Sequence, residues 1–207
     1  MTRTTARLTG LTAALLTGAL VLAGCADDPD AAGHGSMMSG SSSPAGASAE
    51  QAQFDDADVA FAREMIPHHR QAIAMAELAE GRATDPRVLD LTARIQAAQD
   101  PEIQTLTGWL DQWGADHMDG MGHDGMGHGA GMMSERDMHA LMSAGGTEFD
   151  RRFLEQMIVH HTGAVQMAET QIADGRDADA IALAEAIRDS QSAEIAEMQQ
   201  LLANLGS

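Results

Sequence analysis

Between residues 54 and 205, apolar side chains recur every three to four residues, which is the spacing of one face of an amphipathic helix. The first such segment runs from about Asp58 to Glu80. Its apolar face consists of Phe61, Met65, Ala72 and Ala76. Helices, rather than strands, are therefore expected throughout this part of the chain.

Turn and cap residues indicate where the helices begin and end. Gly81 is expected to stop the first helix, and Asp85 is suited to cap a second helix over about 86–113. Pro101 lies in the middle of that second helix and should kink or split it, because proline lacks the N–H that the helical ladder requires.

The helical pattern occurs twice. The motif that begins at Met65 begins again at Met157, 92 residues later (157 − 65). Residues 148–174 and 179–203 predict a second pair of helices, with a short helix at 134–143 before it. A match of this length indicates a duplicated unit. Short turns between long helices make antiparallel neighbours, so the sequence predicts an all-α, four-helix bundle built from two duplicated αα-hairpins.

Residues 1–24 have the pattern of a secretory signal peptide, in which two arginines precede an apolar stretch too short for a membrane span. The stretch ends in Leu22-Ala23-Gly24-Cys25, which resembles the lipobox cleaved before a lipid-modified cysteine in bacterial lipoproteins. Residues 25–53 are rich in Gly, Ser and Ala and predict a flexible tether. We therefore expect acyl chains on Cys25 to anchor a domain at 54–205 to the outer face of the cytoplasmic membrane.

Composition narrows the function classes. The chain has 12 basic and 31 acidic residues, a formal net charge of −19, which disfavours nucleic acid as a partner. A single cysteine excludes an intramolecular disulfide and a cysteine-based zinc site. In contrast, 15 methionines and 9 histidines supply many soft sulfur and imidazole donors.

These donors gather in two places, of which the first is the duplicated motif. Thioether sulfur selects Cu(I) over hard cations, imidazole adds a nitrogen ligand, and Ag(I) should bind the same set. Helical spacing turns the donors of both copies toward the core. The predicted metal ligands are Met65, His68, His69, Met75, Met157, His160, His161 and Met167.

The second place is a glycine-rich crossover between the two units, at 116–133, which predicts a flexible loop rather than a helix. Having no core to pack against, the loop is interpreted as a weaker, labile metal site. Its donors are His117, Met118, Met121, His123, Met126, His128, Met132 and Met133.

Other functions are compatible with parts of this pattern. Methionine stripes commonly fill cores, and an inward histidine can be a hydrogen-bonded core residue, here with Glu64 or Glu77 as its partner. The protein would then be a metal-independent helical interaction module of the cell envelope. A di-iron oxidase needs Glu-x-x-His pairs, but Glu64 lies four residues before His68 and Glu155 five before His160. No other catalytic motif is visible, so the protein is not expected to be an enzyme.

Two copies of Met-x-x-His-His-x-x-Ala-x-x-Met-Ala, at 65–76 and 157–168, resemble the paired signature of a bacterial envelope family known as domain of unknown function 305. The resemblance covers about 54–205 and implies a ferritin-like four-helix bundle, copper binding and copper tolerance. It points to the same eight histidines and methionines of the motif. The second copy has Val159 where the first has Pro67, so any role of a proline kink would be confined to the first half.

Together these patterns predict an extracytoplasmic, lipid-anchored protein that binds Cu(I) and sequesters or buffers it. A copper metallochaperone that passes the ion to a copper-handling protein partner is the alternative within the same chemistry. The sequence decides neither between storage and delivery nor which histidine of each pair is a ligand.

Overall fold

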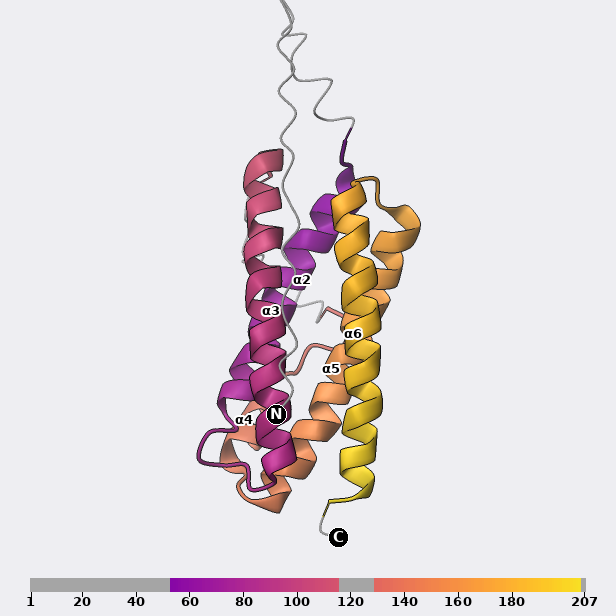
Figure 1. Ribbon diagram of the computed structural model, residues 1–207. Coiled ribbons are helices and arrows are strands. Elements are labelled where there is room, and N and C mark those ends of the chain that lie inside the picture. The colour runs from indigo at the N-terminus through magenta and orange to yellow at the C-terminus, as the bar shows by residue number, and fades with distance from the viewer. Residues whose placement is uncertain (1–52, 116–128, 206–207) are drawn as a thin grey trace, which may run out of the picture. The chain divides into compact units, whose positions relative to one another are not determined.

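The computed structural model describes residues 53–115 and 129–205 of the chain (Figure 1). The helices there are α2 (Asp56–Glu77), α3 (Pro86–Trp113), α4 (Glu135–Ser143), α5 (Thr147–Asp174) and α6 (Ala178–Ala203). These two ranges contain no strand, so their fold is all-α, as predicted. The predicted signal peptide at 1–24, Cys25 and nearly all of the predicted tether lie outside the described residues.

Side-chain caps open α3 and α4, the first of them at Asp85 as expected. Asp85 accepts a hydrogen bond from the Arg87 backbone N–H at 2.9 Å, and a proline follows as the first residue of α3. Ser134 opens α4 through a capping box, in which its hydroxyl accepts from the backbone of Asp137. These caps satisfy N–H groups that have no partner within the helix itself.

Two helix details differ from the sequence expectation. α3 continues through Pro101 instead of splitting there. Ile95 before it and Leu106 after it are both fully buried, so packing on both halves holds the helix together despite the missing hydrogen bond. α2 ends at Glu77 rather than Glu80, because the chain beyond it tightens into turns with three-residue hydrogen bonds.

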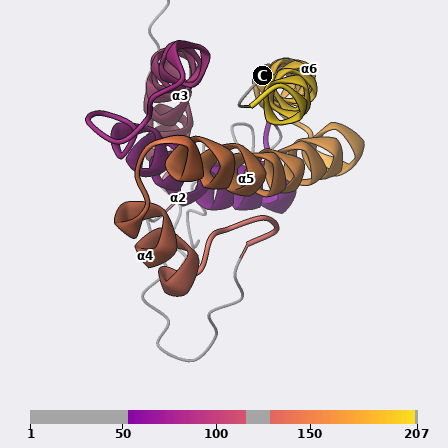
Figure 2. The same ribbon diagram turned by 90° about the horizontal axis from the view of Figure 1, so that it is seen from below.

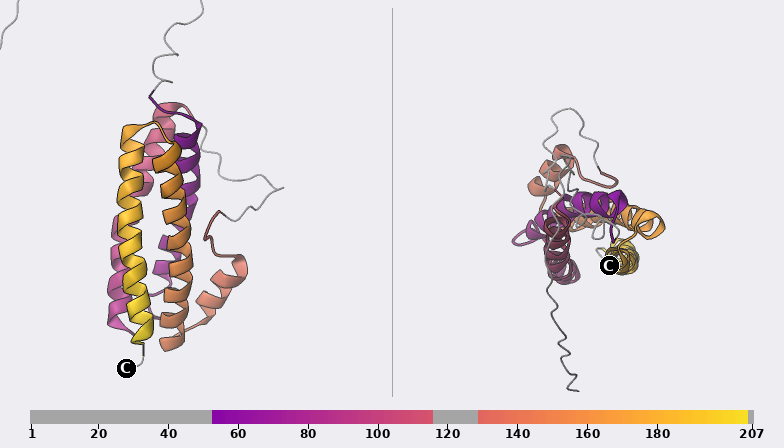
Figure 3. Two further views of the ribbon diagram at one scale, coloured as in Figure 1. Left: turned by 90° about the vertical axis from the view of Figure 1, so that its right-hand side faces the viewer. Right: turned by 90° about the horizontal axis from the view of Figure 1, so that it is seen from above.

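The helices form layers that are visible in three views (Figures 1, 2 and 3). α2 and α5 cross each other in the middle layer, α3 and α6 lie on one side of them, and α4 lies on the other. The ion pair of Arg94 on α3 with Glu197 on α6, at 2.5 Å, joins the two outer helices. The two hairpins, α2–α3 and α5–α6, therefore meet mainly where α2 crosses α5.

Two buried aspartates fix that crossing. The Asp58 carboxylate, at the start of α2, accepts hydrogen bonds from the Gln171 side chain and from the backbone N–H groups of Arg176 and Asp177, in the turn of the other hairpin. Asp150, at the start of α5, accepts from the backbone of Thr84 at 3.1 Å and of the residue after it at 3.0 Å. Each hairpin thus holds the other's turn, which makes α2 antiparallel to α5.

The apolar core falls into two clusters, one toward each end of the α2–α5 crossing. Cluster A contains Phe61, Ala62, Met65, Ile66, Leu106, Leu110, Ala164, Ala168, Ala184 and Ile187. Cluster B contains Ala72, Met75, Ala76, Ala79, Val88, Leu91, Ile95, Met133, Leu141, Phe149, Phe153, Leu154, Met157, Met198 and Leu201. The residues between the two clusters are polar, and they form the candidate site.

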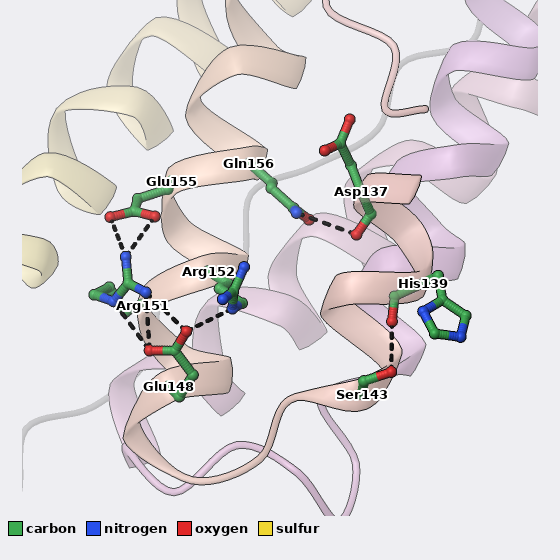
Figure 4. A network of polar contacts seen from close by, with 8 residues as sticks. All are labelled: Asp137, His139, Ser143, Glu148, Arg151, Arg152, Glu155 and Gln156. Atoms are coloured by element: carbon green, nitrogen blue, oxygen red, sulfur yellow. Dashed lines mark hydrogen bonds and ion pairs between the residues drawn. The ribbon is translucent and has the colours of Figure 1, made fainter. Parts of the chain in front are cut away.

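α4 is attached to the outside of α5 near the start of that helix (Figure 4). The Gln156 side chain donates a hydrogen bond to the Asp137 carbonyl at 3.2 Å. Beside it, Arg151 pairs with both Glu148 and Glu155 on the surface of α5. These exposed pairs lie within α5 and contribute little to stability. α4 is held through Leu141, which is fully buried in cluster B. Within the described ranges, no helix combines the length and the apolar character needed to cross a bilayer.

We expect Asp58→Ala to lower the free energy of unfolding by at least about 2 kcal/mol, because it leaves the buried Gln171 amide and two backbone N–H groups of the turn without their acceptor. Asp150→Ala should have a similar effect at the other turn. Urea unfolding at pH 7 measures both. Asp100→Ala, at an exposed position of α3, is the control and should change stability by less than about 0.5 kcal/mol. Equal stability of the Asp58 and Asp100 variants would contradict this role.

Candidate metal centre

Four histidines form a polar layer between cluster A and cluster B. His68 and His69 come from α2, His160 and His161 come from α5, and each is at most 1% exposed. The rings of His68 and His160 meet at the helix crossing, with centroids 3.7 Å apart and planes inclined by 38°. The duplicated motif thus brings its two histidine pairs to the same depth of the core, as the sequence predicts.

The outer ring of each pair contacts a glutamate on the neighbouring helix of its own hairpin. His69 Nε2 lies 2.7 Å from Glu102 Oε2, and His161 Nε2 lies 2.7 Å from Glu194 Oε2. The suggested partners, Glu64 and Glu77, are wrong, because both lie on an exposed face of α2. The repeat could have indicated the two glutamates, because position 102 matches position 194 at the same 92-residue shift that relates the motifs.

Five ring nitrogens in the layer are buried without a hydrogen-bond partner. They are the Nδ1 atoms of His68, His69 and His161, and both nitrogens of His160. Leaving a polar group buried and unpaired costs about 1–3 kcal/mol. An ion that accepts imidazole lone pairs would remove this cost, so the layer fits a metal that prefers nitrogen donors.

The histidines at the crossing are neutral. Burial, reinforced by repulsion from His69, lowers the pKa of His68 to about 3. Burial also lowers the pKa of His160 well below its ordinary value, with repulsion from His68 as the next cause. Neutral imidazole is the form that binds metals, so at neutral pH these rings need not lose a proton first.

The predicted methionine ligands divide into two groups. Met65 and Met157 are fully buried and lie one helical turn from His68 and His160, respectively. Met75 and Met167 lie about two helical turns from the layer, on the side opposite to Met65 and Met157 of their own helices. Met75 belongs to cluster B, and Met167 packs against cluster A. Four histidines and two methionines are therefore gathered at or beside the crossing, and the other two methionines are not.

Met167 differs from its counterpart in exposure. Met75 is fully buried, whereas Met167 is half-buried and lines a surface cavity of about 200 Å³ together with Phe61 and Glu64. Across the described ranges, no three or more His, Cys, Asp or Glu side chains are grouped closely enough to hold one metal ion. Methionine sulfur is outside that set of donors.

Residues 129–133, which we call the strap, lie over the crossing on the side away from α3 and α6 (Figure 2). His68 Nε2 donates to the Ala130 carbonyl at 3.1 Å. The Gln71 side chain pairs with both backbone groups of Met133, donating to its carbonyl at 2.9 Å and accepting from its N–H at 2.7 Å. A Cβ atom on Gly163 would lie 1.8 Å from the Ala130 oxygen, so only glycine there admits the strap.

The strap corrects the expectation for the crossover. Residues 129–133 are packed against α2 and α5, and Met133 belongs to cluster B, because the Gln71 amide replaces the hydrogen bonds that its backbone would otherwise make with water. Packing therefore accounts for this sulfur, contrary to the sequence argument, and Met132 is half-buried. The other predicted loop donors, His117, Met118, Met121, His123, Met126 and His128, lie outside the described residues.

Acid should destabilise the metal-free chain between pH 7.5 and 5. In the unfolded chain the imidazoles titrate near pH 6.5 and bind protons that His68 and His160 do not bind in the folded state. The unfolding constant should therefore rise by up to tenfold for each ring and for each pH unit of acidification. Urea unfolding at the two pH values measures this. His68→Gln with His160→Gln should flatten the dependence, and His139→Gln, at an exposed position of α4, should not. Equal stability of the unaltered chain at both pH values would refute the assignment.

We expect Gly163→Ala to displace the strap, because the new methyl group overlaps the Ala130 carbonyl. Backbone amides at 129–133 should then exchange with deuterium much faster. Gly108→Ala is the matched control: a Cβ at that helical position meets nothing within 4 Å, so the strap should stay protected. Unchanged protection in the Gly163 variant would show that the strap does not depend on this glycine.

Comparison with known proteins assigns the fold to a family. The family model described as "Domain of unknown function (DUF305)" matches residues 58–202. A DUF305 protein from Streptomyces coelicolor, described as secreted, is 31% identical, with a TM-score of 0.65 over 73% of this chain and 94% of that one. A DUF305 fragment from Deinococcus radiodurans is 28% identical, with a TM-score of 0.67 over 73% and 99%.

Structures of CopM are similar to the chain as well. Its Cu(II)-bound form is 37% identical, with a TM-score of 0.62 over 71% of this chain and 96% of that one. CopM has also been solved in Cu(I)-bound and Ag-bound forms. Among curated proteins, none matches the chain significantly. With the family model matching well over half of its length, the chain belongs to the DUF305 family.

Proposed function

We propose that this protein binds Cu(I) at the histidine layer and thereby sequesters or buffers copper. The observation that carries the proposal is the set of five buried ring nitrogens without hydrogen-bond partners. They lie at the helix crossing, flanked by the fully buried Met65 and Met157. Neutral imidazole and thioether together form a soft donor set that favours Cu(I) over hard divalent cations.

Copper is favoured over other soft or borderline ions by two independent lines of support. The chain has one cysteine, Cys25, so its described part offers no thiolate of the kind common in structural zinc sites. The structural neighbour CopM has been crystallised with Cu(I), Cu(II) and silver. Silver(I) shares the ligand preferences of Cu(I) and is expected to bind here as a mimic.

The role we propose is retention rather than catalysis. The layer histidines are at most 1% exposed, and the strap covers the crossing. A catalytic metal needs an open position for substrate, whereas an enclosed donor set suits an ion that is to be held. Residues 116–128 supply further histidines and methionines, which we propose as a weaker, labile site that exchanges copper with the buried one.

We further propose that the protein works outside the cytoplasm, tethered by acyl chains on Cys25. The signal-like residues 1–24 and the lipobox-like sequence before Cys25 support this, as does the description of the Streptomyces coelicolor neighbour as secreted. The duplicated hairpins, with α2 antiparallel to α5, are consistent with a four-helix bundle of the ferritin-like kind.

An anaerobic Cu(I) competition titration tests the function. The unaltered chain should bind tightly, and a variant with all four layer histidines replaced by Ala should lose that binding. His139→Ala removes an exposed histidine of α4 and is the matched control, which should bind as the unaltered chain does. A variant lacking residues 116–128 should keep the tight site and lose only the weaker one.

Two results would overturn the proposal. Loss of tight binding only when residues 116–128 are removed would make the bundle a scaffold for the loop. Absence of any competitive binding by the unaltered chain would favour the metal-independent interaction module. Thermal unfolding provides a second readout, because an ion that binds only the folded state must raise its melting temperature.

A further inference from the structure

Two carboxylates outside the predicted donor set contact the histidine layer. Glu102 lies on α3 and Glu194 on α6, and their side chains are 18% and 15% exposed. Each reaches the Nε2 atom of one layer histidine, His69 or His161, at 2.7 Å. The duplication relates the two pairs, since 194 − 102 equals the 92 residues that separate the motifs. Because both copies of the repeat make the same contact between glutamate and histidine, this contact is a feature of the repeat unit.

These contacts determine which nitrogen of each ring carries the proton. An ionised carboxylate has only acceptor sites, so the imidazole must donate from Nε2. In a neutral ring, the other nitrogen then holds a lone pair. That other nitrogen, Nδ1, is buried and without a hydrogen-bond partner in both His69 and His161.

The tautomer of His68 is determined in the same way, by a different hydrogen-bond acceptor. Its Nε2 donates to the Ala130 carbonyl of the strap, and its Nδ1 is buried and unpartnered. Of the four rings, only His160 has no acceptor on either nitrogen. Three rings of the layer therefore present the same atom, a lone pair on Nδ1, to the interior.

We propose that Glu102 and Glu194 are positioning residues that hold His69 and His161 in the Nε2–H form, so that Nδ1 is the metal-binding nitrogen of these rings. The inference rests on the proposed function, and it adds the ligand atom and the groups that prepare it. A carboxylate behind a ligating imidazole also makes the ring a better donor and fixes its orientation.

The tautomers can be measured before any metal is added. In the chain labelled with ¹⁵N-histidine, long-range ¹H–¹⁵N correlation at pH 7.5 distinguishes protonated from unprotonated ring nitrogens. We expect His69 and His161 to be protonated at Nε2. In Glu102→Gln with Glu194→Gln, the amide can either accept or donate, so a mixture of tautomers should replace the single form. Glu185→Gln, at an exposed position of α6, is the matched control and should leave the tautomers unchanged.

Silver(I) then tests the ligand atom. One equivalent of Ag⁺ should shift the Nδ1 resonances of the layer and leave Nε2 of His69 and His161 protonated. The double glutamate variant should bind Ag⁺ about 10- to 100-fold more weakly, the cost usual for losing a group behind a metal ligand. The control variant should bind as the unaltered chain does.

Each contrary result has a distinct meaning. Protonation at Nδ1 in the metal-free chain would overturn the positioning role, whatever the metal does. Coordination through Nε2, or equal affinity in the double variant, would overturn it as well. Absence of Ag⁺ binding to the unaltered chain would instead refute the proposed function, and the assignment of Nδ1 as a ligand would fall with it.

Discussion

Four imidazoles are buried together where α2 crosses α5, and the packing around that crossing has to accommodate them. A core of this size would be more stable if it were apolar throughout, since each unpaired ring nitrogen carries a desolvation cost. The chain instead interrupts its core between cluster A and cluster B with a polar layer. Such a layer persists because other interactions hold the crossing in place.

The buried aspartates are those other interactions. Asp58 and Asp150 lie at opposite ends of the middle layer, and each satisfies backbone N–H groups in the turn of the other hairpin. They fix how α2 and α5 cross, and hence how His68 meets His160. The glutamates act closer in, within each hairpin, by holding the outer ring of each pair. The duplication therefore preserves a complete unit, which consists of a buried aspartate that binds the turn of the other hairpin, a histidine pair, and a glutamate that contacts the outer histidine of the pair.

One difference between the two motifs decides how the strap is held. Gln71 and Gly163 occupy the same place in the two motifs, two residues after the second histidine. The glutamine binds the strap, and the glycine makes room for it. Met75 of the first motif is fully buried in the cluster that also contains Met133 of the strap and Leu141 of α4, whereas Met167 of the second motif is half-buried. Each unit thus retains its own histidine pair, while the strap is bound by Gln71 of one motif and packs on Gly163 of the other.

Periodicity, caps and the repeat were enough to predict the helices, their pairing into hairpins and the inward direction of the histidines. These features depend on neighbours three or four residues apart, or on self-similarity, both of which a single sequence displays. The hydrogen bonds of the two buried aspartates and of the strap join residues that are 60 or more positions apart, so local sequence patterns could not reveal them. The continuity of α3 through Pro101 also depended on tertiary packing. The glutamates were visible as matched positions, but their partners required the fold.

Copper K-edge X-ray absorption of the chain loaded with one equivalent of Cu(I) would identify the atoms that bind the ion. We expect the ligands of the copper to include both imidazole nitrogen and thioether sulfur, and we expect the imidazole contribution to be lost when the four layer histidines are replaced by Ala. Sulfur ligands alone, or a spectrum that the four replacements leave unchanged, would place the copper outside the histidine layer.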